Sequence, residues 1–227
     1  MNRRSLRSVL RSIGRVDAVV FGGGSLLQDS TSFRSLFYYL VIIAMAWLRG
    51  RPVLLWGQGL GPLQRPISRG MVRLLLPACR SASWRDQTSM DLARRLAPQL
   101  PVQLAPDPVW GLPSQSWSGG QSIVVCWRPS PLLCLRKWTV LLNALQALAE
   151  DLDAPVRWLA FHRHQDAELL DWLADQGVVA SVLRSRITTV LPSSLETVFA
   201  SVRKARLVIP MRLHALILAR LALCPMS

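Results

Sequence analysis

The 227-residue sequence contains few of the residues that build metal centres and disulfide frameworks. Its 4 cysteines form no CxxC pair and show no spacing typical of a zinc site or a disulfide framework. His162 and His164 lie close together without a further ligand, so we expect no metal site, and we interpret the nearby Asp166 as a helix N-cap. This cysteine pattern fits a reducing compartment, which predicts a cytoplasmic protein.

The sequence also lacks a hydrophobic run long enough to cross a bilayer. Its most apolar stretch is residues 36–48, whereas a membrane-spanning helix needs roughly 20 residues. We therefore interpret this stretch as a buried helix. A hydrophobic content of 51% with only 18% charged residues predicts a globular chain with a sizeable core.

Acidic residues are scarce, because 13 of them face 27 basic residues and give a formal net charge of +14. This excess predicts attraction to phosphates, anionic sugars, nucleic acid or a lipid surface without selecting among them. Nearly all of it is arginine, so a codon bias towards arginine explains it equally well. Arginines at positions 3, 7, 11 and 15 predict an amphipathic N-terminal helix with a basic face. A transit peptide has a similar composition, but a strand pattern follows directly, so we expect this helix to belong to the fold.

Short apolar segments alternate with helical patterns along the chain, which predicts an α/β fold of two doubly wound, Rossmann-like lobes with helices on the faces of parallel sheets. In the first half the expected strands are residues 16–21, 52–56 and 81–84, and the expected helices after the first are 36–48, 67–79 and 88–96. In the second half the expected strands are 122–126, 156–161, 178–182 and 207–209, and the expected helices are 138–150, 166–176, 195–204 and 215–223. Because residues 98–120 are rich in proline, we expect lobes at residues 1–115 and 116–227.

The strongest candidate site follows the strand expected at residues 207–209. Arg212 and His214 lie there, where a strand passes into a helix N-terminus whose free backbone N–H groups and dipole favour an anion. Arginine offers a planar fork of donors to a carboxylate or phosphate, and histidine can donate a proton near neutral pH. Arg128 occupies the corresponding position after the first strand of the second lobe. The alternative is that these are ordinary surface and loop residues.

Two glycine turns follow strands of the first lobe, and neither matches a nucleotide-binding motif. Glycine lets a ligand approach backbone N–H groups closely, and neighbouring amide and carboxylate side chains can bind hydroxyls. The candidate ligand-contacting residues are Gly22, Gly23, Gly24, Gln28, Asp29, Gln58 and Gly59. Turns that serve packing alone are the alternative, and Arg85, Asp86 and Asp107 at other strand ends are interpreted as structural.

Taken together, these segments resemble the polysaccharide pyruvyl transferase family, especially its CsaB-type bacterial members. The order and spacing agree along nearly the whole chain. The matching segments are residues 21–29 (FGGGSLLQD), 57–62 (GQGLGP), Arg85-Asp86, Asp107-Pro108 and residues 211–215 (MRLHA).

The resemblance implies a glycosyltransferase-B-like architecture and the transfer of pyruvate from phosphoenolpyruvate, as a ketal, onto two sugar hydroxyls, with release of phosphate and without a cofactor. It also implies that Arg212 and His214 hold the donor, with His214 as the acid, and that Arg128 is a further donor arginine. The glycine turns of the first lobe would then bind the acceptor. Pro210 stands where the family commonly has glycine, which removes one backbone N–H group.

For CsaB-type members the resemblance implies a cell-wall or exopolysaccharide acceptor, including lipid-linked saccharides, and peripheral contact with the anionic inner face of the cell membrane. The family pattern begins with a strand and glycine-rich turn before the first residue here and continues beyond the MRLHA segment. We therefore expect a fold that is incomplete at both ends, with an open sheet edge that a partner covers or that marks an incomplete gene product.

Two other functions stay open. A sugar-nucleotide-dependent glycosyltransferase has the same expected architecture, but it needs acidic residues for the ribose and a longer C-terminal lobe. A non-catalytic nucleic-acid or membrane-surface binder fits the charge. The sequence has neither interleaved aromatic and basic residues nor a known docking helix, so we expect no specific nucleic-acid partner.

Overall fold

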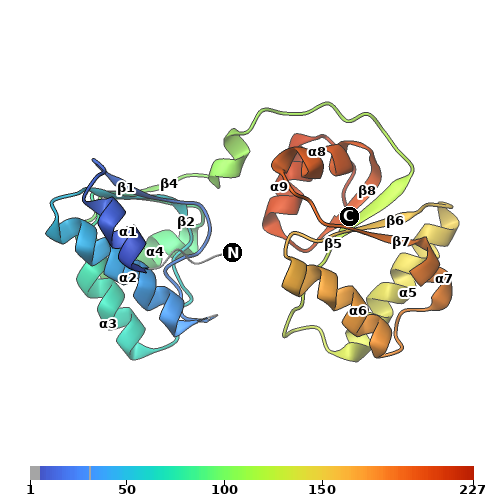
Figure 1. Cartoon of the computed structure of the whole chain (residues 1–227), viewed down its shortest axis with the longest axis horizontal. Coiled ribbons are helices and arrows are strands. Elements are labelled where there is room, and N and C mark those ends of the chain that lie inside the picture. Colours follow the sequence, from blue (N-terminus) through green and yellow to red (C-terminus); the bar gives the residue numbers. More distant parts are fainter. Residues whose placement is uncertain (1–5, 31) are drawn as a thin grey trace. The chain divides into compact units, whose positions relative to one another are not determined.

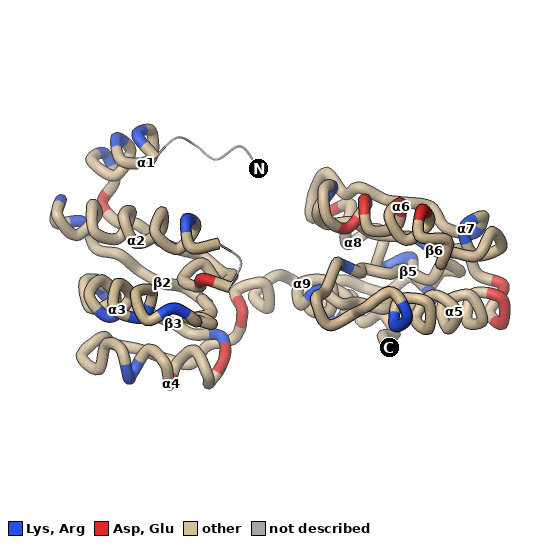
Figure 2. The backbone as a smooth tube through the Cα atoms, turned by 90° about the horizontal axis from the view of Figure 1, so that it is seen from below, with Lys and Arg blue, Asp and Glu red and all other residues tan. Residues whose placement is uncertain are grey.

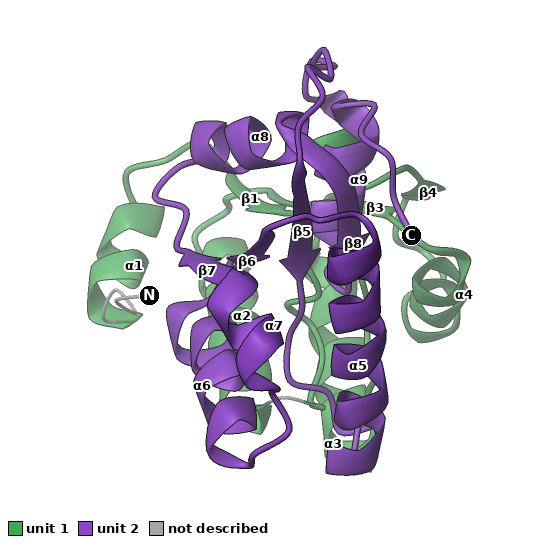
Figure 3. Ribbon diagram, turned by 90° about the vertical axis from the view of Figure 1, so that its right-hand side faces the viewer, with its two compact units in different colours: residues 1–110 green, residues 111–227 purple. Residues whose placement is uncertain are grey.

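The computed structural model describes residues 6–30 and 32–227 and divides the chain into two compact units, Met1–Trp110 and Gly111–Ser227 (Figure 3). Each unit is an α/β structure built on one four-stranded parallel sheet. The division lies within the proline-rich stretch at residues 98–120. No helix in the described part of the chain is long and apolar enough to cross a membrane.

In unit 1 the strands follow one another across the sheet in chain order, β1-β2-β3-β4. The strands are β1 (Val19–Gly22), β2 (Val53–Gln58), β3 (Ser81–Trp84) and β4 (Val102–Leu104). The helices are α1 (Leu6–Ile13), α2 (Phe33–Leu48), α3 (Pro66–Leu75) and α4 (Gln87–Leu96). When every crossover is right-handed and each new strand is added on the same side of the previous one, all the connecting helices lie on one face of the sheet. Figure 1 shows all four helices on the same side of the sheet. The expectation of a doubly wound first lobe is therefore wrong.

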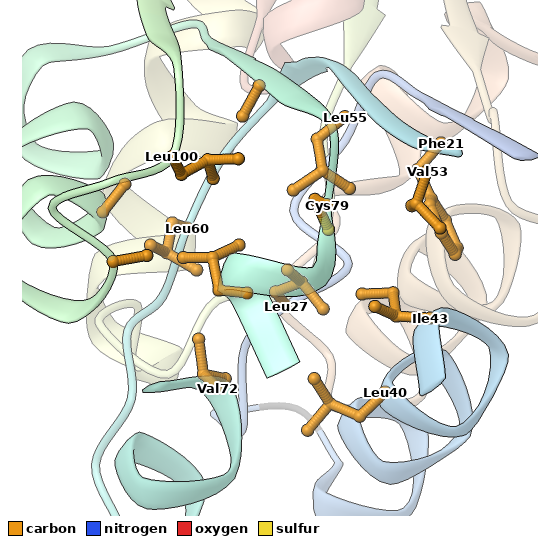
Figure 4. Close-up of a cluster of buried hydrophobic side chains, with 14 of the residues drawn as sticks. Phe21, Leu27, Leu40, Ile43, Val53, Leu55, Leu60, Val72, Cys79 and Leu100 are labelled. Carbon is orange, nitrogen blue, oxygen red and sulfur yellow. The ribbon is translucent and has the colours of Figure 1, made fainter. Parts of the chain in front are cut away.

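The side chains of β2 alternate between this covered face and the open one. Val53 and Leu55 are buried against the helices, together with Leu40 and other residues of α2 (Figure 4). Trp56 is 59% exposed on the opposite face. Helix α2 confirms the buried helix expected at residues 36–48.

Helix α1 confirms that the basic N-terminal segment belongs to the fold. Its apolar residues pack against the core of unit 1, and Ile13 is buried. Arg7, Arg11 and Arg15 are exposed on the other side of this segment. Arg3, the first arginine of the expected basic face, lies outside the described residues.

In unit 2 the strand order is β7-β6-β5-β8, so the chain reverses its direction across the sheet. The strands are β5 (Ser122–Cys126), β6 (Val156–Leu159), β7 (Ile187–Val190) and β8 (Ala205–Pro210). The helices are α5 (Leu135–Asp151), α6 (Glu168–Asp175), α7 (Ser181–Arg186), α8 (Leu195–Arg203) and α9 (Leu213–Leu221). Helices α5, α6 and α7 cover one face, and α8 and α9 cover the other (Figure 1). Every residue of β5 is buried between these two layers.

Two strands differ from the sequence expectations. The strand expected at residues 178–182 is wrong, because helix α7 begins at Ser181 and the strand that follows it, β7, begins at Ile187. Val178 and Val179 lie in a loop, and their apolar side chains pack against the core of unit 2. Strand β4 was missed because its three residues lie in the proline-rich stretch, and prolines are tolerated beside such an edge strand.

Candidate functional site

The reversal of strand order in unit 2 marks a candidate site at the carboxyl ends of β5 and β8. In open α/β sheets, ligands bind outside the strand ends at the point where the order reverses. Cys126, the last residue of β5, pairs with Pro210, the last residue of β8. Arg128 and Arg212 each follow two residues later, so the structure brings these two sequence-predicted residues to neighbouring strand ends.

Arg212 occupies the N-cap position of α9 and directs its guanidinium to a buried carboxylate. Its Nε atom lies 2.8 Å from Oδ2 of Asp166, and its Nη2 atom bonds Oδ1 of the same carboxylate. The Arg212 side chain is 17% exposed and that of Asp166 is 0% exposed. This is a bidentate, charge-assisted ion pair, which holds the guanidinium plane in a defined orientation.

Asp166 is itself held by the connection between β6 and α6. Oδ2 accepts a hydrogen bond from the His162 backbone N–H group at 2.9 Å, and the Asp166 carbonyl accepts one from Nε1 of Trp158 at 2.7 Å. Arg163–Ala167 form a π-helical turn, and α6 begins only at Glu168, without a side-chain cap. The prediction that Asp166 caps this helix is therefore wrong, because its carboxylate is buried and paired with Arg212 instead.

Cys126 lies at the end of β5, between the strands that carry the two members of this pair. The pKa of its thiol is raised to about 12, mainly by burial and also by the charge of Asp166, while the charge of Arg212 opposes this increase. Burial also raises the pKa of Cys79 to about 12 and that of Cys224 to about 11. Cys134 is exposed. The three buried thiols are neutral at physiological pH and are poor nucleophiles.

Arg128 and His214 are both exposed at this edge of the sheet. Arg128 directly follows the buried Trp127, and His214 is the second residue of α9. The first turn of α9 has no side-chain cap, so its leading N–H groups point out of the helix end where an anion is favoured. An exposed guanidinium, a helix N-terminus and an exposed imidazole together can bind a small oxyanion and transfer a proton to it.

The other histidines lie on the β6–α6 connection. His164 is exposed, and its Nδ1 atom lies 2.9 Å from Oε1 of Glu168. Within the described residues, no group of three or more histidine, cysteine or acidic side chains could hold a metal ion.

In unit 1, the structure engages Gln58 with the protein's own backbone. Gln58 is fully buried, and its Nε2 atom donates to the carbonyl of Gly23 and, at 3.4 Å, to that of Phe21. The next residue, Gly59, donates its backbone N–H group to the Gly24 carbonyl at 2.7 Å. These bonds join the two glycine turns. Direct contact of Gln58 with an acceptor sugar therefore has no support in this conformation and stays a prediction.

Asp29 has a similar role beside α3. Its carboxylate accepts the backbone N–H groups of Gln64 at 2.7 Å and Arg65 at 2.9 Å, and the residue is 6% exposed. Burial by itself raises the pKa of Asp29, but these hydrogen bonds and the Arg65 charge lower it overall. The parts of the predicted acceptor site that lie at least partly at the surface are Gly22, Gly23, Gly24 and Gln28.

A polar cluster joins three strand ends of unit 1, and two of its members, Arg85 and Asp107, were interpreted from the sequence as structural. Arg85, after β3, donates from Nη1 to Oδ2 of Asp107 at 3.0 Å and from Nη2 to Oγ of Ser25 at 2.9 Å. Asp107 follows β4 and Ser25 follows β1. Arg85 directly follows β3, Ser25 directly follows a glycine turn and Asp107 comes three residues after β4. These positions were the available signal, but only the strand order shows that the three residues meet.

Comparisons with known proteins agree with this architecture. The family model of the polysaccharide pyruvyl transferases matches residues 2–226. No curated protein matches the sequence. A chain in the crystal structure of accessory secretory proteins 1, 2 and 3 of Streptococcus pneumoniae is similar in fold, with a TM-score of 0.53 and 17% identity over 97% of this chain and 43% of that one. A chain of the Glycosylation Associate Protein (Gap123) complex of Streptococcus agalactiae has a TM-score of 0.43 and 12% identity over 86% of this chain and 46% of that one. The present chain thus spans less than half the length of either structure.

Proposed function

Because the chain belongs to the polysaccharide pyruvyl transferase family, we propose that it comes from an enzyme that transfers pyruvate from phosphoenolpyruvate, as a ketal, onto a cell-wall or exopolysaccharide sugar. The observation that carries this proposal is the arrangement in unit 2. Arg128 and Arg212 leave adjacent parallel strands where the strand order reverses, and His214 stands on the first turn of the helix that follows. This chemistry requires only the donor and the acceptor sugar, so no cofactor or metal is proposed.

In the proposed reaction, His214 protonates the methylene carbon of the donor and positive charge develops at the neighbouring carbon. One sugar hydroxyl attacks that carbon. The second hydroxyl then displaces phosphate and closes the ketal. Of the two hydroxyl protons, one restores His214 and the other leaves with phosphate. Arg128, Arg212 and the α9 N-terminus stabilise the negative charge of the donor carboxylate and of the departing phosphate.

We place the acceptor on unit 1, at the partly exposed glycine turn of residues 22–24 and at Gln28. The GT-B-like architecture belongs to the same proposal and is supported by two α/β units that each contain a parallel sheet. A lipid-linked acceptor at the inner membrane face would give the exposed Arg7 and Arg11 on α1 an anionic surface to contact.

The alternative of a nucleic-acid binder rests on the net charge alone. Figure 2 shows that lysine and arginine positions occur on helices of both units. The sequence adds no interleaved aromatic and basic residues and no known docking helix to this charge, so we do not propose nucleic acid as the partner.

The test of the proposal measures phosphoenolpyruvate binding by calorimetry and acceptor-dependent phosphate release. His214→Gln is expected to lower kcat by about 10²-fold or more, since it removes the proton donor. Arg128→Ala is expected to raise the KM for the donor.

The matched control is Arg220→Ala, which changes an exposed arginine in the last turn of α9, at the end of that helix opposite to the strand ends. This control should retain the kinetics of the wild type. Unchanged kinetics in His214→Gln and Arg128→Ala, or a wild-type protein that does not bind the donor, would contradict the proposed function.

A further inference from the structure

We propose that Asp166 is a positioning residue of the donor site, which orients the guanidinium of Arg212 without touching the substrate itself. This inference rests on the proposed function, because Arg212 must bind the donor for its orientation to matter. It assigns a catalytic consequence to an ion pair whose two members lie 46 residues apart in the sequence.

The first argument is the edge of the guanidinium that Asp166 occupies. A guanidinium has five N–H donors in a rigid plane. Asp166 takes the side edge, through Nε and Nη2 of Arg212. The end edge, which consists of one hydrogen on Nη1 and the second hydrogen on Nη2, is outside this pair. That end edge has the right geometry to bind a second planar oxyanion through two parallel hydrogen bonds.

The second argument is the position of the pair in the sheet. Strand β5 lies between β6, which precedes Asp166, and β8, which precedes Arg212. The Arg212 side chain must therefore extend past the carboxyl end of β5 to reach the carboxylate. Arg128 leaves that same strand end. The pair consequently holds Arg212 at the strand end from which Arg128 also leaves.

The third argument is that Asp166 cannot reorient or bind the donor. It is fully buried, and the His162 backbone N–H group and the Trp158 indole hold it from the β6 side. Its π-helical turn is a local irregularity of the kind that is frequent at functional sites. A fixed, buried carboxylate next to an anion site would repel the donor if it were not paired, so its role acts through Arg212.

In this arrangement the residue that orients the guanidinium differs from the groups that attract the anion by their charge. Asp166 compensates the charge of Arg212, so the pair offers directed N–H donors while Arg128 and the α9 N-terminus supply the net attraction. Removing the carboxylate charge leaves Arg212 as an uncompensated cation. Simple anion binding is then retained or strengthened, while the geometry needed for catalysis is lost. Substitution of a residue with only a structural role would not lower kcat while leaving anion affinity unchanged or stronger.

The experiment compares Asp166→Asn and Asp166→Glu with the control Asp171→Asn, which removes an exposed carboxylate on α6. For each full-length protein we would measure kcat and KM for the donor, the Kd for inorganic phosphate, and Tm. Asp166→Asn should lower kcat about 10- to 100-fold per folded molecule, with an equal or tighter phosphate Kd. Asp166→Glu should also lower kcat, because its extra methylene displaces the guanidinium. Asp171→Asn should match the wild type.

The outcomes separate this inference from the proposed function. Unchanged kcat in the folded Asp166 variants overturns the positioning role and leaves the proposed function intact, provided that His214→Gln is inactive. If kcat and phosphate affinity both fall in proportion to the folded fraction, Asp166 has a purely structural role. That result also overturns the positioning role. A wild-type protein that binds neither phosphate nor phosphoenolpyruvate overturns both.

A measurement on the wild-type protein tests the inference even if the Asp166 variants do not fold. In an NMR spectrum the Arg212 Nε–H signal, assigned through its loss in Arg212→Lys, should stay protected from exchange when phosphate is added. The Nη signals should shift. Loss of Nε–H protection on addition of phosphate would mean that the anion displaces Asp166, and it would overturn the inference.

Discussion

Removal of the Arg212 side chain should destabilise unit 2 far more than a typical surface arginine substitution. In Arg212→Met, the fully buried carboxylate of Asp166 loses two charge-assisted hydrogen bonds and keeps only the one from the His162 backbone. Breaking a buried ion pair by removing one partner costs about 3–5 kcal/mol, because an uncompensated charge stays buried. We expect the free energy of unfolding of unit 2 to fall by about this amount.

A second substitution should recover most of this loss. Asp166→Asn removes the buried charge but keeps an acceptor for the His162 N–H group. The double variant Arg212→Met/Asp166→Asn should therefore cost only about 1–2 kcal/mol, since replacing a buried pair with neutral groups is often tolerated. The difference between the double variant and the sum of the single variants measures the coupling of the pair.

Equilibrium urea unfolding of the full chain, followed by circular dichroism and tryptophan fluorescence, provides these free energies. The control is Arg184→Met, which breaks the exposed pair of Arg184 with Asp171 at 3.9 Å and should cost less than about 1 kcal/mol. A loss below about 1 kcal/mol in Arg212→Met, or single-variant losses that simply add in the double variant, would refute the reasoning about the buried charge.

Three further predictions concern other parts of the chain. Gly57→Ala should lower the unfolding free energy by about 2–4 kcal/mol in urea titrations, because the new Cβ atom would lie 2.1 Å from Cδ of Pro108 at a φ of +61°. The matched change Gly70→Ala, in open space on α3, should raise it by about 0.5–1 kcal/mol, and the opposite signs should appear in the same assay. Asp29→Asn should lower Tm above about pH 4, because a carboxyl whose folded-state pKa is lowered stabilises the fold above its unfolded pKa and loses this effect as the pH falls through the folded value. A Tm difference between the wild type and the variant that does not change with pH would contradict that role. Iodoacetamide should label Cys134 in the folded protein, and mass spectrometry should detect labelling of the three buried cysteines only after denaturation.

Most strands and helices could be predicted because their signals are local. Strands β2 and β5 are short apolar runs next to glycine, proline or polar residues, and α2 is one continuous apolar stretch. Strand β4 was missed because its three residues lie in the proline-rich stretch, and β7 was misplaced because the valines at residues 178–182 form a stronger local strand pattern than its own sequence ITTV. Such short runs have too few residues for periodicity to distinguish them from a loop.

Which faces of the two sheets are covered by helices could not be predicted, because this depends on the order of the strands in each sheet. Unit 1 and unit 2 show the same alternation of strand and helix in the sequence. Consecutive order in unit 1 leaves one face open and Trp56 exposed on it, whereas the reversal in unit 2 covers both faces. Strand pairing joins residues that are distant in the chain, so local sequence patterns do not indicate which strands pair.

The sequence by itself determined the position of Arg212 and His214 at a strand-to-helix turn, because two residues that close together are placed by local structure alone. It also determined the family, through motifs spread along the chain. Only the tertiary structure decided that Arg128 lies at the neighbouring strand end and that Asp166 is the buried counter-ion of Arg212 instead of a helix cap. The physical reason is that burial and ion pairing depend on which distant segments pack together, and a carboxylate 46 residues away has no local signature of its partner.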